Sequence, residues 1–474
     1  MTQFALMKGS KTSEDARYLD ALPVNMTPIP AQTNNASGYL RSFKGIELLF
    51  ECDGPSMGGL YNDLLQKEYR ILGHKLYEDD KVVGDLVNPV MANVCHSPNR
   101  QAFVDDGKLK FFSNGQITEL KNWTKAEKPG PNEPPFFDLT GVIDVDRHQG
   151  RFVWLNKKRF GATSLENEQR PDFVAPFYSP ESDPDNNKAI RSCFGKYVAV
   201  FGRHTTEFFS LTGDANNLYQ TQKNMETQCG IVATPAVCLF GESFAAIGSG
   251  KNEALGVVVI SPGKYQKIST ATIDIILAKY KESELSEALI EYVTRDDQAL
   301  LLVHLPNETL GYQTKQNSWF QLKSDIRGDA PYTGRHILYN HDKGLTIGDR
   351  NQGRVGVLTD KVCSQYDELV EHLLYTPFIQ VNAKRGKVPL YDLGFSSITG
   401  HVAKAQRLYI SITFDGMHYG NERTIEFNEP LDFTSKTLVS DVGAVEGSIG
   451  FKLRWVTKDN VSISGLNLRV GYGG

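Results

Sequence analysis

The sequence lacks the paired cysteines and long apolar runs that mark several protein classes. It has only 6 cysteines in 474 residues, and no two are spaced as Cys-x-x-Cys. We therefore expect reduced thiols, with neither a disulfide framework nor a zinc site. No run approaches the roughly 18 apolar residues of a membrane span, and the N-terminal segment has no apolar stretch before a cleavage site. We therefore expect no membrane span and no signal peptide.

The sequence also lacks an excess of positive charge. Lys and Arg total 51 against 56 Asp and Glu, which gives a net charge of −5. A mildly acidic chain is poorly suited to holding nucleic acid by neutralising its phosphates. The 40% hydrophobic and 23% charged residues are ordinary for a globular protein and suffice for a large core.

Motifs for metal or cofactor chemistry are missing as well. The 10 histidines include no His-Glu-x-x-His pair, and there is no Gly-x-Gly-x-x-Gly loop. The stretch 247–252 resembles a phosphate loop only superficially and is expected to be a hairpin turn. The oxygen-rich loop 180–187 lacks the spacing of an EF-hand. We predict no catalytic residues, no cofactor and no metal.

What the sequence does contain favours β structure. It has 25 Phe, 20 Tyr, 42 Gly and 21 Pro, a composition typical of strands joined by tight turns. Pairs of apolar strands around a polar turn recur seven times, with starts 33 to 56 residues apart. The pairs start at His74, Gly107, Gly150, Gly195, Glu242, Gln298 and Ile337. This spacing is near that of β-propeller blades, and an outlying strand in 38–51 would complete the last blade. The alternative is an irregular stack of antiparallel sheets.

We therefore predict an all-β protein: a β-propeller of about seven blades with a helical insertion, followed by a C-terminal β-sandwich. The expected boundaries are an extended N-terminal arm over 1–36, the propeller over 37–362 and the sandwich over 363–474. Proline and asparagine in the arm argue against a continuing helix or a central strand. Segment 364–378 is expected to run from a short helix into a strand.

The helical insertion is expected around 271–293. One helical face contains Ile273, Ile276, Leu277 and Tyr280. A second short helix, capped by Ser283, would place Leu285, Ala288, Leu289 and Tyr292 on its apolar face. Such an insertion either covers a sheet edge or binds a partner.

A propeller also raises the hypothesis of a glycan-binding or glycan-cleaving protein. Glycan cleavage requires a pair of carboxylates on either side of the glycosidic bond. Acidic residues lie beside predicted strands at Asp144, Asp146, Asp296 and Asp297. However, the sequence has no repeated Ser-x-Asp-x-Gly-x-x-Trp turns of the sialidase type. The residues by themselves thus indicate a structural or binding protein that is not an enzyme.

The whole chain resembles the tail hub proteins of short-tailed bacteriophages, also called packaged-DNA stabilisation proteins. The similarity is collinear and carries no catalytic motif. The segments that carry it are 18–26, 37–46, 206–213, 300–306, 364–378, 414–420, 427–433 and 450–458. The loops 125–135 and 166–187 look variable, which argues against transferring contacts to them.

The resemblance implies a structural protein of the virion tail, assembled in the cytoplasm of the host bacterium. It implies a homo-hexameric ring below the portal-adaptor ring, in contact with the tail needle and the tailspike trimers. Such a ring would retain packaged double-stranded DNA and form part of the ejection channel, through which DNA passes without specific binding.

Interface anchors in such a protein are expected among exposed aromatic residues, because binding hot spots favour Trp, Tyr and Arg. The candidates before the sandwich are Tyr366, His372 and Tyr375. The candidates at its first turn are Met417, His418 and Tyr419. The alternative for each is an ordinary core or turn residue.

Overall fold

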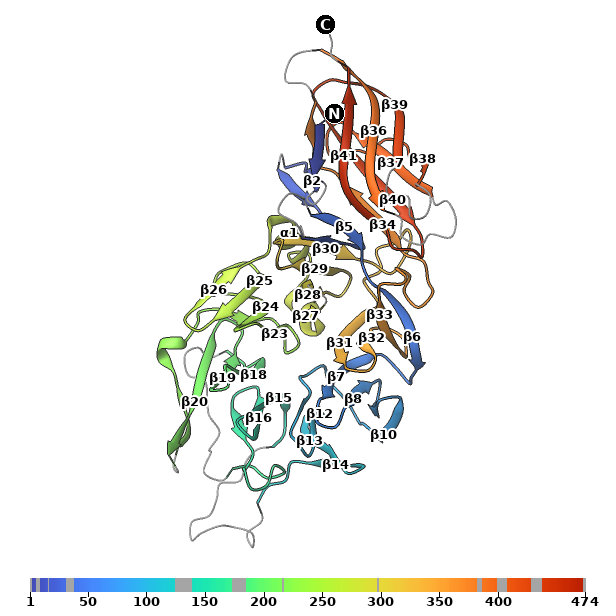
Figure 1. Cartoon of the computed structure of the whole chain (residues 1–474). Coiled ribbons are helices and arrows are strands. Elements are labelled where there is room, and N and C mark those ends of the chain that lie inside the picture. The colour runs from blue at the N-terminus through green and yellow to red at the C-terminus, as the bar shows by residue number, and fades with distance from the viewer. Residues whose placement is uncertain are drawn as a thin grey trace. The chain divides into compact units, whose positions relative to one another are not determined.

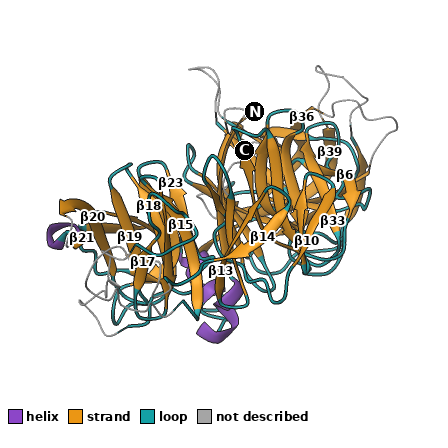
Figure 2. Ribbon diagram, turned by 90° about the horizontal axis from the view of Figure 1, so that it is seen from below, coloured by secondary structure: helices purple, strands orange, loops and turns teal. Residues whose placement is uncertain are grey.

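The computed structural model describes the chain except for residues 1, 6–8, 16, 31–37, 124–138, 173–184, 215–216, 296–297, 382–385, 399–406, 428–436 and 472–474. Strands dominate it, as Figures 1 and 2 show. The chain forms two compact units, each discontinuous in sequence. The first unit comprises 1–48, 293–333 and 356–474, and the second comprises 49–292 and 334–355. The domain boundaries expected from the sequence stay predictions.

The second unit is a series of small antiparallel sheets, each built from strands that follow one another in the chain. The first two sheets contain β7 (Ser56–Asn62), β8 (Lys67–Leu72), β9 (Lys75–Glu78) and β10 (Lys81–Asp85), then β11 (Cys95–His96), β12 (Gln101–Asp105), β13 (Lys108–Ser113) and β14 (Gln116–Glu119). The next two contain β15 (Val142–His148), β16 (Arg151–Asn156) and β17 (Phe160–Ala162), then β18 (Ala189–Cys193), β19 (Tyr197–Phe201), β20 (Thr206–Asp214) and β21 (Asn217–Thr221). The fifth contains β22 (Gly230–Ile231), β23 (Val237–Phe240), β24 (Ser243–Ser249), β25 (Gly256–Ser261) and β26 (Lys264–Lys267).

Two further antiparallel sheets follow, and their strands are divided between the two units. One has the order β27 (Leu289–Arg295), β28 (Gln298–His304), β29 (Thr309–Gln313) and β30 (Ser318–Leu322). The other has the order β31 (Gly334–Asn340), β32 (Gly344–Asp349), β33 (Arg354–Thr359) and β6 (Gly45–Glu51). β31 and β32 belong to the second unit, and the unit boundaries fall within β33 and β6. Each of the seven predicted hairpins falls in a different one of these sheets, and β6 is the predicted outlying strand.

The close approach of β33 to β6 depends on a glycine. A Cβ atom at Gly356 would lie 2.4 Å from the side chain of Ile46 and 2.7 Å from the backbone oxygen of Glu47. Any larger residue would push these neighbouring strands apart, so the position requires glycine.

The remainder of the first unit is a sandwich of two sheets. The six-stranded sheet contains β39 (Thr437–Val445), β36 (Val388–Ile398), β41 (Ser462–Val470), β5 (Tyr39–Ser42) and β4 (Met26–Ile29) in that order, with β1 (Thr2–Ala5) also paired to β41. The five-stranded sheet contains β34 (Glu371–Tyr375), β40 (Ser448–Val456), β37 (Arg407–Thr413) and β38 (Arg423–Glu426), with β35 (Ile379–Gln380) paired to β40. Their inner faces share one apolar core that includes Trp455 and Phe451.

The N-terminal segment is more regular than the extended arm that the sequence predicted. β1, β4 and β5 are strands of the sandwich, and β2 (Gly9–Thr12) forms a hairpin with β3 (Tyr18–Ala21). Met26 and Leu40 belong to the sandwich core, so burial of apolar side chains orders the segment. Pro28 lies in β4, the last strand in the sheet order, where its missing N–H group is tolerated.

Two helical predictions need correction. The first helix exists as α1 (Ala271–Leu277), with Ile273 and Leu277 buried. It is followed by a 3-10 turn, Glu282–Glu287, which starts after Lys281 and not at Ser283. Leu289 and Tyr292 are not helical, because they lie in β27. Within the described residues no helix is long and apolar enough to cross a membrane.

The helix expected at the start of 364–378 is absent. Tyr366 and Asp367 have φ values of 50° and 65°, in the left-handed region that an α-helix cannot contain. The backbone makes a turn there, with the N–H groups of Gln365 and Glu368 each donating to the other's carbonyl oxygen. The predicted strand follows as β34.

Candidate interaction surface

The turn after β37 presents two of the predicted anchors to solvent. Met417 is 38% exposed and the side chain of His418 is 83% exposed. Phe414, which the sequence prediction did not include, is 58% exposed beside them. An exposed apolar pair of this kind in one turn fits a contact point for another protein.

Asp415 holds this turn in a fixed conformation. Its Oδ1 accepts hydrogen bonds from the backbone N–H groups of Met417 and His418, both at 2.8 Å. Its Oδ2 lies 2.7 Å from the His418 Nδ1. The bond with the His418 side chain is the main reason that the pKa of Asp415 lies well below its usual range.

The N-terminal hairpin also holds the turn in place by hydrogen bonds. The Thr12 hydroxyl donates to the Asp415 carbonyl oxygen at 2.5 Å, and the Thr12 N–H donates to the Gly416 oxygen at 3.2 Å. Gly416 has φ of 76° and would place a Cβ atom 3.1 Å from Thr12, so the turn depends on glycine at this position. The turn is therefore preformed, which lowers the entropy lost when a partner binds.

The outer face of the five-stranded sheet continues from this turn. Leu453 and Trp455 of β40 are buried, so the alternating residues Lys452 and Arg454 point outward. Tyr409 of β37 lies opposite Arg454, and its ring centroid is 4.4 Å from the guanidinium carbon. We call this the tyrosine face, and it comprises Tyr375, Tyr409, Tyr419, Lys452 and Arg454.

Two of the predicted anchors meet on the tyrosine face. The rings of Tyr375 and Tyr419 lie 5.9 Å apart in an edge-to-face arrangement. The Lys452 ammonium lies 5.6 Å from the Tyr419 ring centroid. Burial, with smaller contributions from Tyr375 and Asp415, raises the pKa of Tyr419 to about 12, so both phenols stay neutral and can donate hydrogen bonds.

The other two predicted anchors are covered by the chain itself. His372 is fully buried, and its ring stacks on Trp455 with centroids 5.6 Å apart. Tyr366 is only 9% exposed. Neither side chain offers much area to a partner, so we place both in the core and retain Tyr375, Met417, His418 and Tyr419 as candidates.

The sequence analysis did not select Tyr409, Lys452, Arg454 and Thr12. The strict alternation of apolar and polar residues in β37 and β40 would have identified the first three as outward-facing. No local signal marks Thr12, because its contact with the turn joins segments more than 400 residues apart.

The carboxylates considered for glycan cleavage have structural partners. Asp144 is fully buried, forms an ion pair with Arg191, and accepts from the backbone N–H groups of Asn93 and Ile190. Asp146 accepts from the N–H groups of Arg147 and Ser192, both at 2.7 Å. These bonds join β15 to β18 of the next sheet. Asp296 and Asp297 lie outside the described residues.

The cysteines and polar loops form no metal site or disulfide among the described residues. All six cysteines are free thiols, and burial raises the pKa of each. No group of three metal-ligating side chains is found among the described residues. Most of loop 180–187, and all of loop 125–135, lie outside that part.

Comparison with known proteins gives matches along the whole chain. A family model described as "Bacteriophage P22 Gp10, beta-propeller" matches residues 2–363, and a second, "Bacteriophage P22 Gp10, beta-sandwich", matches residues 371–471. The tail hub protein gp10 of Salmonella phage P22 is 35% identical over 479 residues, which covers 99% of each chain. The family matches confirm the predicted fold class of a β-propeller with a C-terminal β-sandwich.

The solved structures found by comparison share little sequence with this chain. The N-terminal domain of Nup159 aligns with a TM-score of 0.41 and 10% identity, covering 71% of this chain and 99% of that one. The WD40 domain of Neurospora crassa Pan2 aligns with a TM-score of 0.37 and 8% identity, covering 64% and 89%.

Proposed function

Because this chain belongs to the P22 Gp10 family of phage tail hub proteins, we propose that it forms a hexameric ring that completes the tail below the portal adaptor and retains the packaged DNA. The protein is a structural component of the virion tail and belongs to no enzyme family. The observation that carries the proposal is the 35% identity to a tail hub protein over 99% of both chains.

The proposed partners are the adaptor ring, the tail needle and the tailspike trimers. Double-stranded DNA would pass through the ring during ejection without specific binding. The net charge of −5 supports this role, because a basic channel wall would hold the phosphates of the moving DNA.

We assign the protein contacts to the tyrosine face and the turn 414–420. This surface combines tyrosines, a lysine, an arginine and the exposed Phe414 and Met417, a composition typical of binding hot spots. Each copy needs only a modest interface, because a ring engages its partners at several equivalent sites together and the weak contacts reinforce one another.

The test of the hub function is DNA retention. Particles are assembled without this protein, purified, and their packaged DNA is measured. We expect capsids to fill and then lose their DNA, and the purified chain together with the needle protein to restore retention. Particles that keep their DNA and have complete tails without the protein would refute the proposal. The glycan-binding alternative would then be examined by sugar-dependent thermal stabilisation of the chain.

The test of the surface uses the same assay with a double variant, Met417→Ala with Tyr419→Ala. We expect it to restore retention at least tenfold less efficiently than the wild-type chain at equal concentration. The control is Leu64→Ala, which removes a 66% exposed apolar side chain from the second unit. If a folded double variant restored DNA retention as well as the wild-type chain, the assignment of protein contacts to this surface would be wrong. The proposed hub function would be unaffected.

A further inference from the structure

A pocket of about 750 Å³ lies between the first two sheets of the second unit. All of its lining residues fall within 65–115, so it belongs to that unit alone. They come from β8, β9, β10, β12 and β13 and from the turns after β7, β11 and β13. The volume lies in the range of about 300–1,000 Å³ that is common for ligand sites. The contacts proposed above lie in the first unit and leave this pocket without a role.

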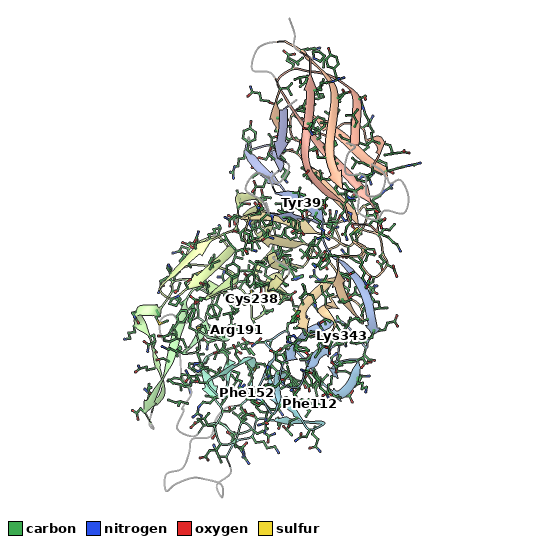
Figure 3. All side chains as sticks on the ribbon, viewed as in Figure 1. Tyr39, Phe112, Phe152, Arg191, Cys238 and Lys343 are labelled. Carbon is green, nitrogen blue, oxygen red and sulfur yellow. The ribbon has the colours of Figure 1, made fainter. Side chains whose placement is uncertain are left out.

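The base of the pocket is formed where the two sheets meet. Gln101 of β12 is the strand partner of Phe112 of β13, and such partners lie on the same face of a sheet. The ring centroid of Phe112, which Figure 3 labels, is 5.9 Å from that of Tyr69 in β8 of the other sheet. The Tyr69 hydroxyl donates to the Glu78 Oε2 at 2.9 Å. Gln101 therefore projects from the face of its sheet that contacts the neighbouring sheet.

The three charged side chains that line the pocket all have partners. Lys67 forms an ion pair with Glu78, and both residues line the pocket. The Nε of Arg100 lies 2.9 Å from the Oε2 of Glu168. A charged ligand would have to break one of these pairs or lose its own hydration without gaining a counter-charge. The pocket is therefore suited to an uncharged ligand.

Gln101 supplies a hydrogen-bond donor that lacks an acceptor. The residue is only 2% exposed, and its Nε2 has no acceptor among the described residues. Native proteins rarely leave such a buried donor without a ligand or water. A carboxamide both donates and accepts hydrogen bonds. A peptide group matches it, because the peptide carbonyl accepts from the carboxamide nitrogen and the peptide N–H donates to the carboxamide oxygen.

The accessible apolar lining is aliphatic. Leu65 is 45% exposed, and Val83 is partly buried beside the core of these two sheets. The rings of Tyr69 and Phe112 are only 2% and 4% exposed, so neither offers an open face on which a sugar ring could stack. Leu65 and Val83 can instead contact an aliphatic side chain.

Two of the turns that line the pocket are held by hydrogen bonds. The Leu65 N–H donates to the Asn62 Oδ1 at 3.2 Å, and the Arg100 N–H donates to the Ser97 Oγ at 3.2 Å. The pocket is therefore preformed, which lowers the entropy lost when a ligand binds.

We propose that this pocket binds an uncharged peptide segment of a partner protein. One peptide group of the segment pairs with the Gln101 carboxamide, and an adjacent aliphatic side chain contacts Leu65 and Val83. The inference does not rest on the hub function or on the tyrosine face, because the pocket lies in the other unit.

The experiment is an NMR titration of the ¹⁵N-labelled full chain. The probe is acetyl-alanyl-leucyl-alanine methylamide, and the matched probes have aspartate or lysine in place of leucine. The fourth probe is diacetylchitobiose, which has amide groups and no aliphatic side chain. The side-chain amide signals of Gln101 are identified as those lost in Gln101→Met.

We expect the leucine peptide to shift the Gln101 amide signals with a dissociation constant below about 10 mM, and to bind at least about fivefold more tightly than the other three probes. A dissociation constant above about 10 mM, equal or tighter binding of a charged peptide or the saccharide, or unmoved Gln101 signals would each overturn the proposal.

Two variants locate the binding site. Gln101→Met removes the donor while keeping the length of the side chain, and should weaken binding of the leucine peptide about fivefold. Its control is Gln228→Met, because Gln228 is exposed and does not line the pocket. Leu65→Ala should also weaken binding, whereas Leu64→Ala should not, because Leu64 is exposed in the same turn and lies outside the lining.

If Gln101→Met does not fold, the comparison of Leu65→Ala with Leu64→Ala decides the question. Unchanged binding by a folded Gln101→Met or Leu65→Ala protein would refute the assignment.

Discussion

Replacing His372 by phenylalanine should remove part of the acid sensitivity of the chain. The imidazole is fully buried against Trp455, and burial lowers its pKa to about 4. In the unfolded chain the group has its ordinary pKa of about 6.5. Phenylalanine keeps an aromatic ring on Trp455 and cannot take up a proton.

The sign of the effect follows from proton binding. Between pH 6.5 and pH 4 the unfolded chain binds a proton at His372 and the folded chain does not, so acid favours unfolding. The stabilising contribution is complete above pH 6.5 and is lost as the pH falls to 4. A difference of about 2.5 pKa units corresponds to about 3 kcal/mol, of which about 2 kcal/mol is already lost at pH 5.

The assay is urea unfolding at pH 7 and pH 5, followed by tryptophan fluorescence. We expect the wild-type chain to lose about 2 kcal/mol more than His372→Phe between the two pH values. The buried His148, whose pKa burial also lowers to about 4, contributes equally to both proteins and cancels.

His74→Phe serves as the control, because that side chain is exposed and forms no ion pair among the described residues, and it should behave like the wild type. The direct check is the NMR titration of the His372 ring. Equal pH dependence of the wild type and His372→Phe, or a ring pKa near 6.5 in the folded chain, would contradict the reasoning.

Three further predictions concern other groups. Glu68→Gln should destabilise the second unit by about 3–5 kcal/mol in urea unfolding, because it leaves the fully buried Arg70 without its ion pair, and adding Arg70→Met should recover much of that loss. Asp146→Asn should flatten the pH dependence between 4 and 6: the pKa of Asp146 is raised, so its contribution to stability is present at low pH and is lost as the pH rises through about 6. Asp415→Ala should leave overall stability nearly unchanged while speeding hydrogen exchange of the Met417 amide, which then has no carboxylate acceptor. A loss below 1 kcal/mol for Glu68→Gln, an unchanged pH profile for Asp146→Asn, or unchanged exchange for Asp415→Ala would contradict the respective prediction.

Family membership and the hairpin pattern were both accessible from the sequence. The hairpins are local: each joins strands that follow one another, so turn residues and apolar alternation within about 20 residues indicate them. All seven hairpins and the helix around Ile273 were recovered for this reason. The prediction of a helix at the start of 364–378 was wrong, because Tyr366 adopts a left-handed backbone conformation that the neighbouring sequence does not indicate.

Contacts between distant segments were decided only by the tertiary structure. β5 and β6 are almost adjacent in sequence, yet β5 pairs with β41 of the sandwich and β6 lies beside β33. The burial of His372 and the anchoring of the 414–420 turn by Thr12 are of the same kind. Local composition determines that a segment is a strand. Which sheet it joins, and which of its side chains remain exposed, depends on the total apolar area that the folded chain can bury.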